Sequence, residues 1–335
     1  MKTLISNLHV TFAVMLMIVA VSSLGAAQTT HAFLWTQPTG MQDMGTILGW
    51  EDSYAFAINT KGQVVGYDRN SMGQTTSFRW TRGTGSQRLR ALAGSSSVAY
   101  GVNAAGQIVG AYGGTALAYF WSPITGFQDL GNLGGSQTVA TSINSSGQVA
   151  GYSETTAGLD HAILWTENSG LQDLGTLPGG TCSEAFAIND KGQIVGQADD
   201  ADGVTLAVMW RSGQIHILGK LGGKGKSATG TATGINNAGQ VVGWSTIDAS
   251  KDIHPFLWSA STGMQDLGTQ GVSSYATGIN NLGEVVGYSG GGGLESAFLW
   301  TSSNGGQSLG TLGGSLSIAL AINDTGQVVG YSTLP

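Results

Sequence analysis

Residues 233–245 read Thr-Gly-Ile-Asn-Asn-Ala-Gly-Gln-Val-Val-Gly-Trp-Ser. Two short apolar segments flank the tetrapeptide from Asn236 to Gly239, in which Asn stands first and Gly fourth. An aliphatic residue, Asn-x-x-Gly and then Gln or Glu recur in six further places: 58–63, 102–107, 143–148, 188–193, 279–284 and 322–327. Each copy could be a binding site or the turn of a repeated structural unit. The fold that the sequence predicts follows from the choice between these two interpretations.

The chemistry of the tetrapeptide favours a turn. Asn first and Gly fourth are typical of a type I turn followed by a left-handed residue, because the Asn side chain bonds the backbone two residues on and Gly accepts a positive φ. The two residues between them vary freely among the seven copies. A binding site would constrain side chains at the tip, so we interpret Asn-x-x-Gly as a hairpin within a structural unit.

Other features fall into register when the copies are aligned. Each unit holds four candidate strands: a run ending in Trp, a Gln-Asp-Leu-Gly run, a run ending in Ile-Asn, and a Gln-Val-Val-Gly-Tyr run. The repeated tryptophans are residues 35, 80, 121, 165, 210, 258 and 300. Their common position predicts packing between neighbouring units. The glycine of Val-Val-Gly, as at Gly243, predicts a close approach by a neighbouring backbone or a Trp ring.

A repeat of 40 to 48 residues with four short strands is typical of a β-propeller blade. No segment carries a sustained helical period. We therefore predict an all-β, seven-bladed β-propeller with four antiparallel strands per blade. Residues 316–332 should supply two strands of the last blade and residues 31–48 the other two, so that N- and C-terminal strands close the ring and leave no open edge.

The N-terminal segment has the pattern of a signal peptide. Lys2 precedes an apolar run from Phe12 to Val21, and small residues at Gly25 and Ala27 fit cleavage before Gln28. The run is short for a spanning helix, which needs about 20 residues. We therefore expect residues 1–27 to be a cleaved signal and residues 28–335 to form one secreted propeller domain, a monomer with no integral membrane segment.

Composition excludes several function classes. The chain is 10% charged with a net charge of −7, which argues against nucleic-acid binding, because that needs basic stripes. Its 55 glycines and 5 prolines follow no collagen-like period. The single cysteine, Cys182, permits no internal disulfide. We expect no cofactor.

Matches to known site motifs are weak. The carboxylates of the Gln-Asp-Leu-Gly run recur in only four units (Asp43, Asp129, Asp173 and Asp266), and a position so often replaced favours a turn or ladder contact over a catalytic acid. Asp199, Asp200, Asp202 and Gly203 form a partial calcium loop without the closing Glu. Surface-loop acids are the interpretation that we favour there, and the histidines lack metal-ligand spacing. We predict no metal site.

The repeated segments His31-Ala32-Phe33-Leu34-Trp35, Gln-Asp-Leu-Gly and Ile-Asn-x-x-Gly-Gln-Val-Val-Gly-Tyr resemble the HAF-repeat proteins, a family of bacterial extracellular repeat proteins. The likeness extends from Thr30 to Ser332 in seven copies, of which residues 76–80 are the most divergent. The resemblance implies secretion and a bacterial source. It implies no activity and no catalytic residues.

Function should lie in the segments that do not repeat, since binding residues concentrate on loops held by a rigid scaffold. We predict a non-enzymatic binding or scaffolding module for a protein or cell-surface glycan. Our ligand-face candidates are Trp50, Glu51, Asp52, Glu184, Asp200, Asp202, Lys224 and Lys226. One alternative is an exported polysaccharide hydrolase or lyase whose loop carboxylates converge on the channel, and another is a cell-envelope structural protein.

Overall fold

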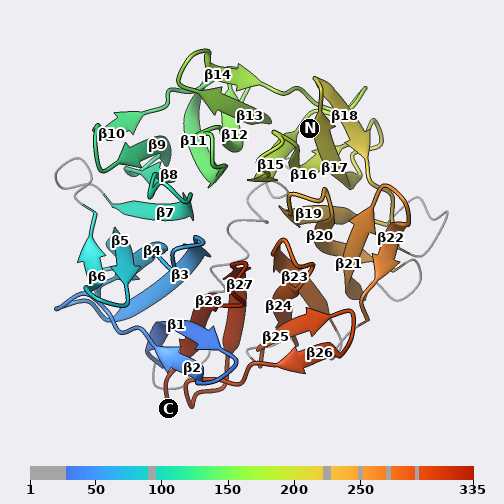
Figure 1. Ribbon diagram of the computed structural model, residues 1–335. Helices are drawn as coiled ribbons and strands as arrows, with labels where there is room; N and C mark the ends of the chain where they lie inside the picture. The colour runs from blue at the N-terminus through green and yellow to red at the C-terminus, as the bar shows by residue number, and fades with distance from the viewer. Residues whose placement is uncertain (1–27, 90–95, 222–227, 248–251, 269–272, 291–293) are drawn as a thin grey trace, which may run out of the picture.

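The computed structural model describes residues 28–89, 96–221, 228–247, 252–268, 273–290 and 294–335. Seven four-stranded antiparallel sheets stand around a central channel, each sheet forming one blade (Figure 1). The predicted seven-bladed β-propeller is thereby confirmed. The described ranges contain no helix that is long and apolar enough to cross a membrane. The predicted signal, residues 1–27, lies outside the described residues.

The first strand of each blade lines the channel, and the second pairs with it after the Asn-x-x-Gly turn. The first strands are β3 (Asp52–Ile58), β7 (Ser97–Val102), β11 (Gly134–Ile143), β15 (Ser183–Ile188), β19 (Gly230–Ile235), β23 (Ser274–Ile279) and β27 (Ser317–Ile322). The second strands are β4 (Val64–Arg69), β8 (Ile108–Tyr112), β12 (Val149–Thr155), β16 (Ile194–Asp199), β20 (Val241–Thr246), β24 (Val285–Ser289) and β28 (Val328–Thr333).

The third strand carries the repeated Trp, and the short fourth strand forms the outer edge of the blade. The third strands are β1 (Thr30–Thr36), β5 (Thr75–Thr81), β9 (Leu117–Ser122), β13 (Asp160–Thr166), β17 (Thr205–Arg211), β21 (Ile253–Ser259) and β25 (Ser296–Thr301). The fourth strands are β2 (Gly40–Asp43), β6 (Gly85–Arg88), β10 (Gly126–Asp129), β14 (Gly170–Asp173), β18 (Gln214–Ile217), β22 (Gly263–Asp266) and β26 (Gly305–Ser308).

Both ends of the described chain build the closing blade, whose strand order is β2-β1-β28-β27. Strand β1 pairs with β28 in antiparallel register, with Phe33 opposite Gly330. Beyond this pairing the amide of Leu334 donates to the carbonyl of Thr29 at 2.9 Å. The predicted closure by N- and C-terminal strands is therefore present.

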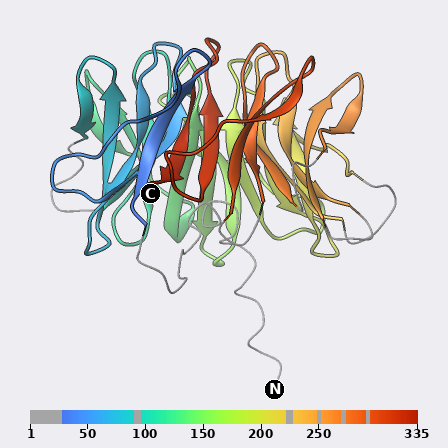
Figure 2. The ribbon, with the colours of Figure 1, turned by 90° about the horizontal axis from the view of Figure 1, so that it is seen from below.

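The strands run between two faces of a disc (Figure 2). We call the face that bears the seven Asn-x-x-Gly turns the hairpin face. The opposite face, called the loop face, carries the connections from second to third strands and from each blade to the next. In the hairpin after β19 the amide of Gly239 donates to the carbonyl of Asn236 at 3.0 Å, and Gly239 has a φ of +83°. This is the predicted type I turn with a left-handed glycine.

Every first strand carries a β-bulge opposite the glycine of Val-Val-Gly. In the blade of β19 the register shifts between Ala232 and Gly234, beside the pair of Ala232 with Gly243. A Cβ on Gly243 would lie 2.0 Å from the carbonyl oxygen of Thr231 and 2.9 Å from the ring of Phe256. The predicted close approach is thus made by the partner strand's carbonyl and a Phe ring, and only glycine has room for it.

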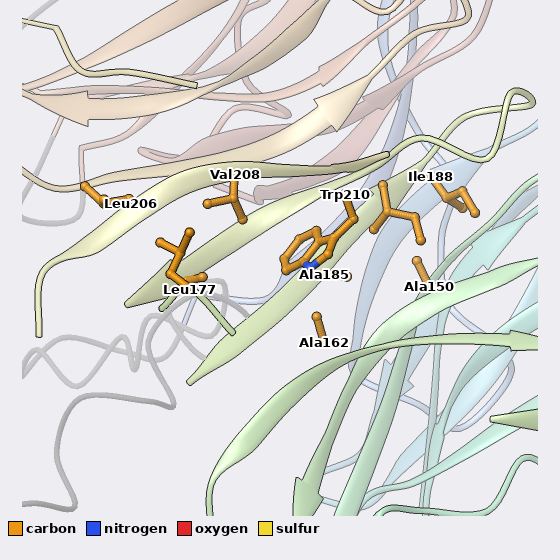
Figure 3. Close-up of a cluster of buried hydrophobic side chains, with 10 residues drawn as sticks. Ala150, Ala162, Leu177, Ala185, Ile188, Leu206, Val208 and Trp210 are labelled. Atoms are coloured by element: carbon orange, nitrogen blue, oxygen red, sulfur yellow. The ribbon is translucent and has the colours of Figure 1, made fainter. Parts of the chain in front are cut away.

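The core lies between blades. In one cluster, Ala150 and Ala162 of the β11–β14 blade pack against Ala185, Val208 and Trp210 of the next blade (Figure 3). Trp210 is 4% exposed. The repeated tryptophan therefore packs between blades as predicted, and burial of such aliphatic and aromatic surface is the main stabilising contribution.

Candidate functional site

Seven asparagines form a closed ring of hydrogen bonds around the channel. The Nδ2 atom of each donates to the main-chain carbonyl of the corresponding Asn one blade on, over 2.9 to 3.1 Å. The ring runs through Asn59, Asn103, Asn144, Asn189, Asn236, Asn280 and Asn323 and returns to Asn59. The repeated Asn therefore joins neighbouring blades as well as shaping its own turn.

The remaining hydrogen-bonding groups of each ring asparagine, its Oδ1 atom and its second Nδ2 hydrogen, bond within its own hairpin. Asn236 Oδ1 accepts the amides of Ala238 and Gln240 at 3.1 and 3.0 Å, and its Nδ2 also donates to Gln240 Oε1 at 2.8 Å. Both amide hydrogens and both oxygen lone pairs are then engaged. These asparagines hold the scaffold and offer nothing to a ligand, in agreement with the turn interpretation.

The channel opens on the hairpin face into a cavity of about 220 Å³. Each blade contributes three consecutive residues to its lining. The deepest layer is aliphatic: Ile58, Val102, Ile143, Ile188, Ile235, Ile279 and Ile322. The ring asparagines form the second layer. The third, which we call the rim, consists of the residues after them: Thr60, Ala104, Ser145, Asp190, Asn237, Asn281 and Asp324.

Five rim residues, from Ser145 to Asp324, are linked from blade to blade by four hydrogen bonds. The amides of Ser145, Asp190, Asn237 and Asn281 each donate to a side-chain oxygen of the next rim residue, over 2.8 to 2.9 Å. Asn237 Nδ2 also donates to Asp190 Oδ2, and Asn281 Nδ2 donates to Asp324 Oδ2. Two carboxylates thus flank two amides on one side of the mouth, while Thr60 and Ala104 leave the other side open.

Within the described residues, no ion pair is found for either rim carboxylate, Asp190 or Asp324. Burial opposes ionisation of Asp190, but hydrogen bonds from Ser145 and Asn237 hold its pKa below the usual value. The ion pairs of the described part of the chain include His31–Asp43, Arg69–Asp52, His161–Asp173 and His254–Asp266. Neither rim carboxylate belongs to one, so both keep acceptor capacity toward the cavity.

The predicted candidates Trp50, Glu51 and Asp52 lie together on the loop face. The guanidinium of Arg88 lies 5.8 Å from the ring centroid of the half-buried Trp50. Glu51 is exposed. Asp52 is buried, and its Oδ2 accepts both Nε and Nη2 of Arg69, at 3.0 and 2.8 Å. Two donors of Arg69 thus meet one oxygen of Asp52, while its Oδ1 accepts the amide of Thr30 at 2.9 Å.

The other acidic candidates lie in the blade of β15–β18, with two blades between them and Glu51. Glu184 is 3% exposed on β15 and accepts Gln197 Nε2 at 3.0 Å. Burial, with the nearby Asp160 charge, raises the pKa of Glu184 to about 8.

Asp200 Oδ1 accepts the amides of Asp202 and Val204 at 2.9 and 3.0 Å, so this acid shapes a turn. Asp202 is exposed in that turn. Lys224 and Lys226 lie outside the described residues.

The carboxylates of the Gln-Asp-Leu-Gly run make local contacts. Asp43 accepts His31 Nδ1 at 2.9 Å and the amide of Gly45 at 2.7 Å. The hydrogen bond to Asp43 raises the pKa of His31. His161–Asp173 and His254–Asp266 repeat this pair. No group of three or more His, Cys, Asp or Glu residues in the described ranges is placed to hold a metal ion.

The rim is the feature that the sequence did not single out. Its residues occupy the first variable position of Asn-x-x-Gly, which turn chemistry leaves unconstrained. The available signal was compositional: this position is Asp or Asn in four consecutive units, Asp190, Asn237, Asn281 and Asp324.

Comparison with known proteins shows the fold. No family model matches the chain, and no curated protein is significantly similar to it. Among solved structures, a protein described as TolB from Agrobacterium tumefaciens is similar over 92% of this chain and 99% of its own, with 10% identity and a TM-score of 0.54. Virginiamycin B lyase from Staphylococcus aureus is similar over 91% and 99%, with 9% identity and a TM-score of 0.51.

A puromycin-hydrolysing peptidase from Mycobacterium tuberculosis shares 12% identity and a TM-score of 0.54. This chain covers 48% of the peptidase, and 80% of this chain is matched. Because proteins with such different names share the architecture, the likeness identifies the propeller and leaves the function to the site.

Proposed function

We propose that this protein is a secreted, non-enzymatic binding or scaffolding propeller of the HAF-repeat type, engaging a protein or cell-surface glycan. The observation that carries the proposal is the cavity at the channel mouth, where an aliphatic floor lies beneath a polar rim. Ligand sites combine apolar walls with a few placed polar groups. The closed ring of asparagines supplies a rigid support for such a site.

The positions of the acidic candidates favour binding over hydrolysis. A glycosidase needs two carboxyl groups about 5 to 9.5 Å apart beside the sugar. Asp52 is paired with Arg69, Asp200 is bonded to its own turn, and Glu184 is bonded to Gln197. Glu51 is separated from the latter two by two blades. Each acid is used locally or stands apart.

Residues 28–335 tested on a glycan array and in a reducing-sugar assay would decide between these functions. We expect saturable binding to a glycan or a protein partner without release of reducing ends. Turnover that is abolished in Glu51→Gln/Asp52→Asn/Asp200→Asn would favour the hydrolase instead. Absence of both binding and turnover would contradict the proposal and favour an envelope structural protein.

A further inference from the structure

The rim of the cavity has unused main-chain donors in one part and carboxylate acceptors in another. The main-chain amides of Ser145, Asp190, Asn237 and Asn281 each donate to the side chain of the next rim residue. The amides of Asp324, Thr60 and Ala104 are the corresponding groups in the remaining three blades, and no hydrogen-bond partner within the described chain is found for them. Three adjacent main-chain donors among the residues that line the mouth are therefore available where the linked arc stops.

Within that arc the carboxylate acceptors are Asp190, next to its first residue Ser145, and Asp324, at its other end. Asp190 and Asp324 each receive two or more hydrogen bonds from neighbouring rim groups, yet two carboxylate oxygens offer about four acceptor positions. Asn237 and Asn281 each retain a second Nδ2 hydrogen. A ligand that meets all of these groups must both donate and accept at closely spaced positions.

Hydroxyl groups satisfy this requirement, since each donates one hydrogen bond and accepts two. The floor beneath the rim is aliphatic, and the cavity of about 220 Å³ is smaller than the 300–1,000 Å³ of drug-sized pockets. A single sugar ring matches both properties, because its C–H face is apolar and its hydroxyls project around its edge.

We propose that the channel mouth is a subsite for one pyranose unit, with Asp190 and Asp324 accepting from its hydroxyls and the amides of Thr60 and Ala104 donating to them. This inference rests on the proposed binding function and assigns its site and ligand class. The ligand face is then the hairpin face, at the other end of the channel from Glu51 and Asp52.

The repeat itself supplies variants that the fold accepts. Asn occupies the rim position in two blades, so Asp190→Asn/Asp324→Asn keeps an oxygen that can accept the neighbouring amide while removing both charges. Glu167→Gln is the matched control, because Glu167 is exposed in the turn between β13 and β14 and the change also removes a carboxylate charge. Circular dichroism and thermal midpoints establish that both variants fold.

Binding of a panel of methyl hexopyranosides to residues 28–335 is measured by saturation-transfer NMR and calorimetry. We expect at least one glycoside to bind, with a Kd raised tenfold or more by Asp190→Asn/Asp324→Asn and unchanged by Glu167→Gln. Glycoside binding that the rim variant leaves intact would overturn the mouth as the site while leaving the proposed function standing.

If no glycoside binds the wild-type protein, the sugar assignment is wrong, whatever partner the protein has. Peptide-array binding that depends on the rim carboxylates would likewise overturn the sugar assignment, although it would support the proposed binding function. The two proposals can therefore fail separately.

Discussion

Asp68 stands at a position that other blades give to serine. Ser153, Ser245 and Ser332 each accept an amide from the segment that enters their blade, over 3.0 to 3.2 Å. Asp68 Oδ2 accepts the amide of Ile47 in the same way at 2.8 Å, but its fully buried Oδ1 has no partner. A buried carboxylate with one unpaired oxygen is destabilising.

Asp68→Ser should therefore stabilise the fold at neutral pH. Burial raises the pKa of Asp68 to about 6, so between about pH 4 and 6 the unfolded chain releases this proton while the folded chain retains it. Stability falls as the pH rises through that window and stays lower above it. We expect a gain of about 1 kcal/mol at pH 7.5 and little change at pH 4, measured by denaturant unfolding. An equal effect at both pH values would contradict this explanation.

Gly243 tests the bulge at the residue scale. A Cβ there would lie 2.0 Å from the carbonyl of Thr231, and paired backbone cannot move aside without breaking the ladder. Gly243→Ala should cost about 3 kcal/mol, comparable to the strain of overpacked cores. Gly83→Ala is the control, because nothing lies within 4 Å of its Cβ and its φ is not positive. Equal unfolding midpoints for the two variants would refute the steric argument.

At the scale of the element, β15 carries a buried acid, Glu184, at a position where no other first strand has an acid. The positions corresponding to Glu184 are Val98, Val139 and Ile318 in three other blades. Gln197 bonds Glu184 and also accepts the hydroxyl of Thr231 in the next blade at 2.7 Å. A small polar network thus replaces apolar packing between these two blades.

Glu184→Gln should stabilise the protein most at alkaline pH. The pKa of about 8 lies above the ordinary value of a glutamate, so folding opposes ionisation. The resulting penalty grows from about pH 4.5 to 8 and is constant above that. The variant should gain on the order of 2 kcal/mol at pH 8.5 and almost nothing at pH 4, where both forms are neutral. Destabilisation at pH 8.5 would indicate that the charge is needed.

The elements were predictable because their determinants are local. Asn-x-x-Gly fixes a turn, and the alternation around it fixes two strands whatever the neighbouring blade contains. The hydrogen-bond partners of a residue in the neighbouring blade lie about one repeat away in the chain. The sequence therefore could not show that Asn236 bonds the carbonyl of Asn280. The strand register places Arg88 in β6 at the position that Asp occupies in four blades. In β18 the preceding turn is one residue shorter, so the register places Ile217 there and not His216, a difference that aligning the glycines of the repeats does not reveal.

At the scale of the whole molecule, the ring closes inside a blade. Strand β1 pairs with β28 over six residue positions, and Asn323 bonds Asn59 across the adjoining interface. The two ends of the chain are therefore joined by main-chain hydrogen bonds inside one blade, whereas neighbouring blades are held together mainly by side-chain packing. The ring should therefore resist opening at its ends as strongly as elsewhere.

Circular permutation tests this closure. The ends can be joined by a short Gly-Ser linker from Pro335 to Gln28, since Leu334 and Thr29 are hydrogen-bonded. New ends placed between residues 89 and 96 leave every blade continuous, so the ring closes by interblade contacts alone. We expect this permutant to fold, with unfolding in guanidinium at least tenfold faster, about 1.4 kcal/mol in the barrier. New ends between Ser71 and Met72 split a blade into two strands plus two, as in the natural chain, and should preserve the wild-type unfolding rate. If both permutants unfold at the same rate, strand pairing at the closure adds nothing to the packing between blades.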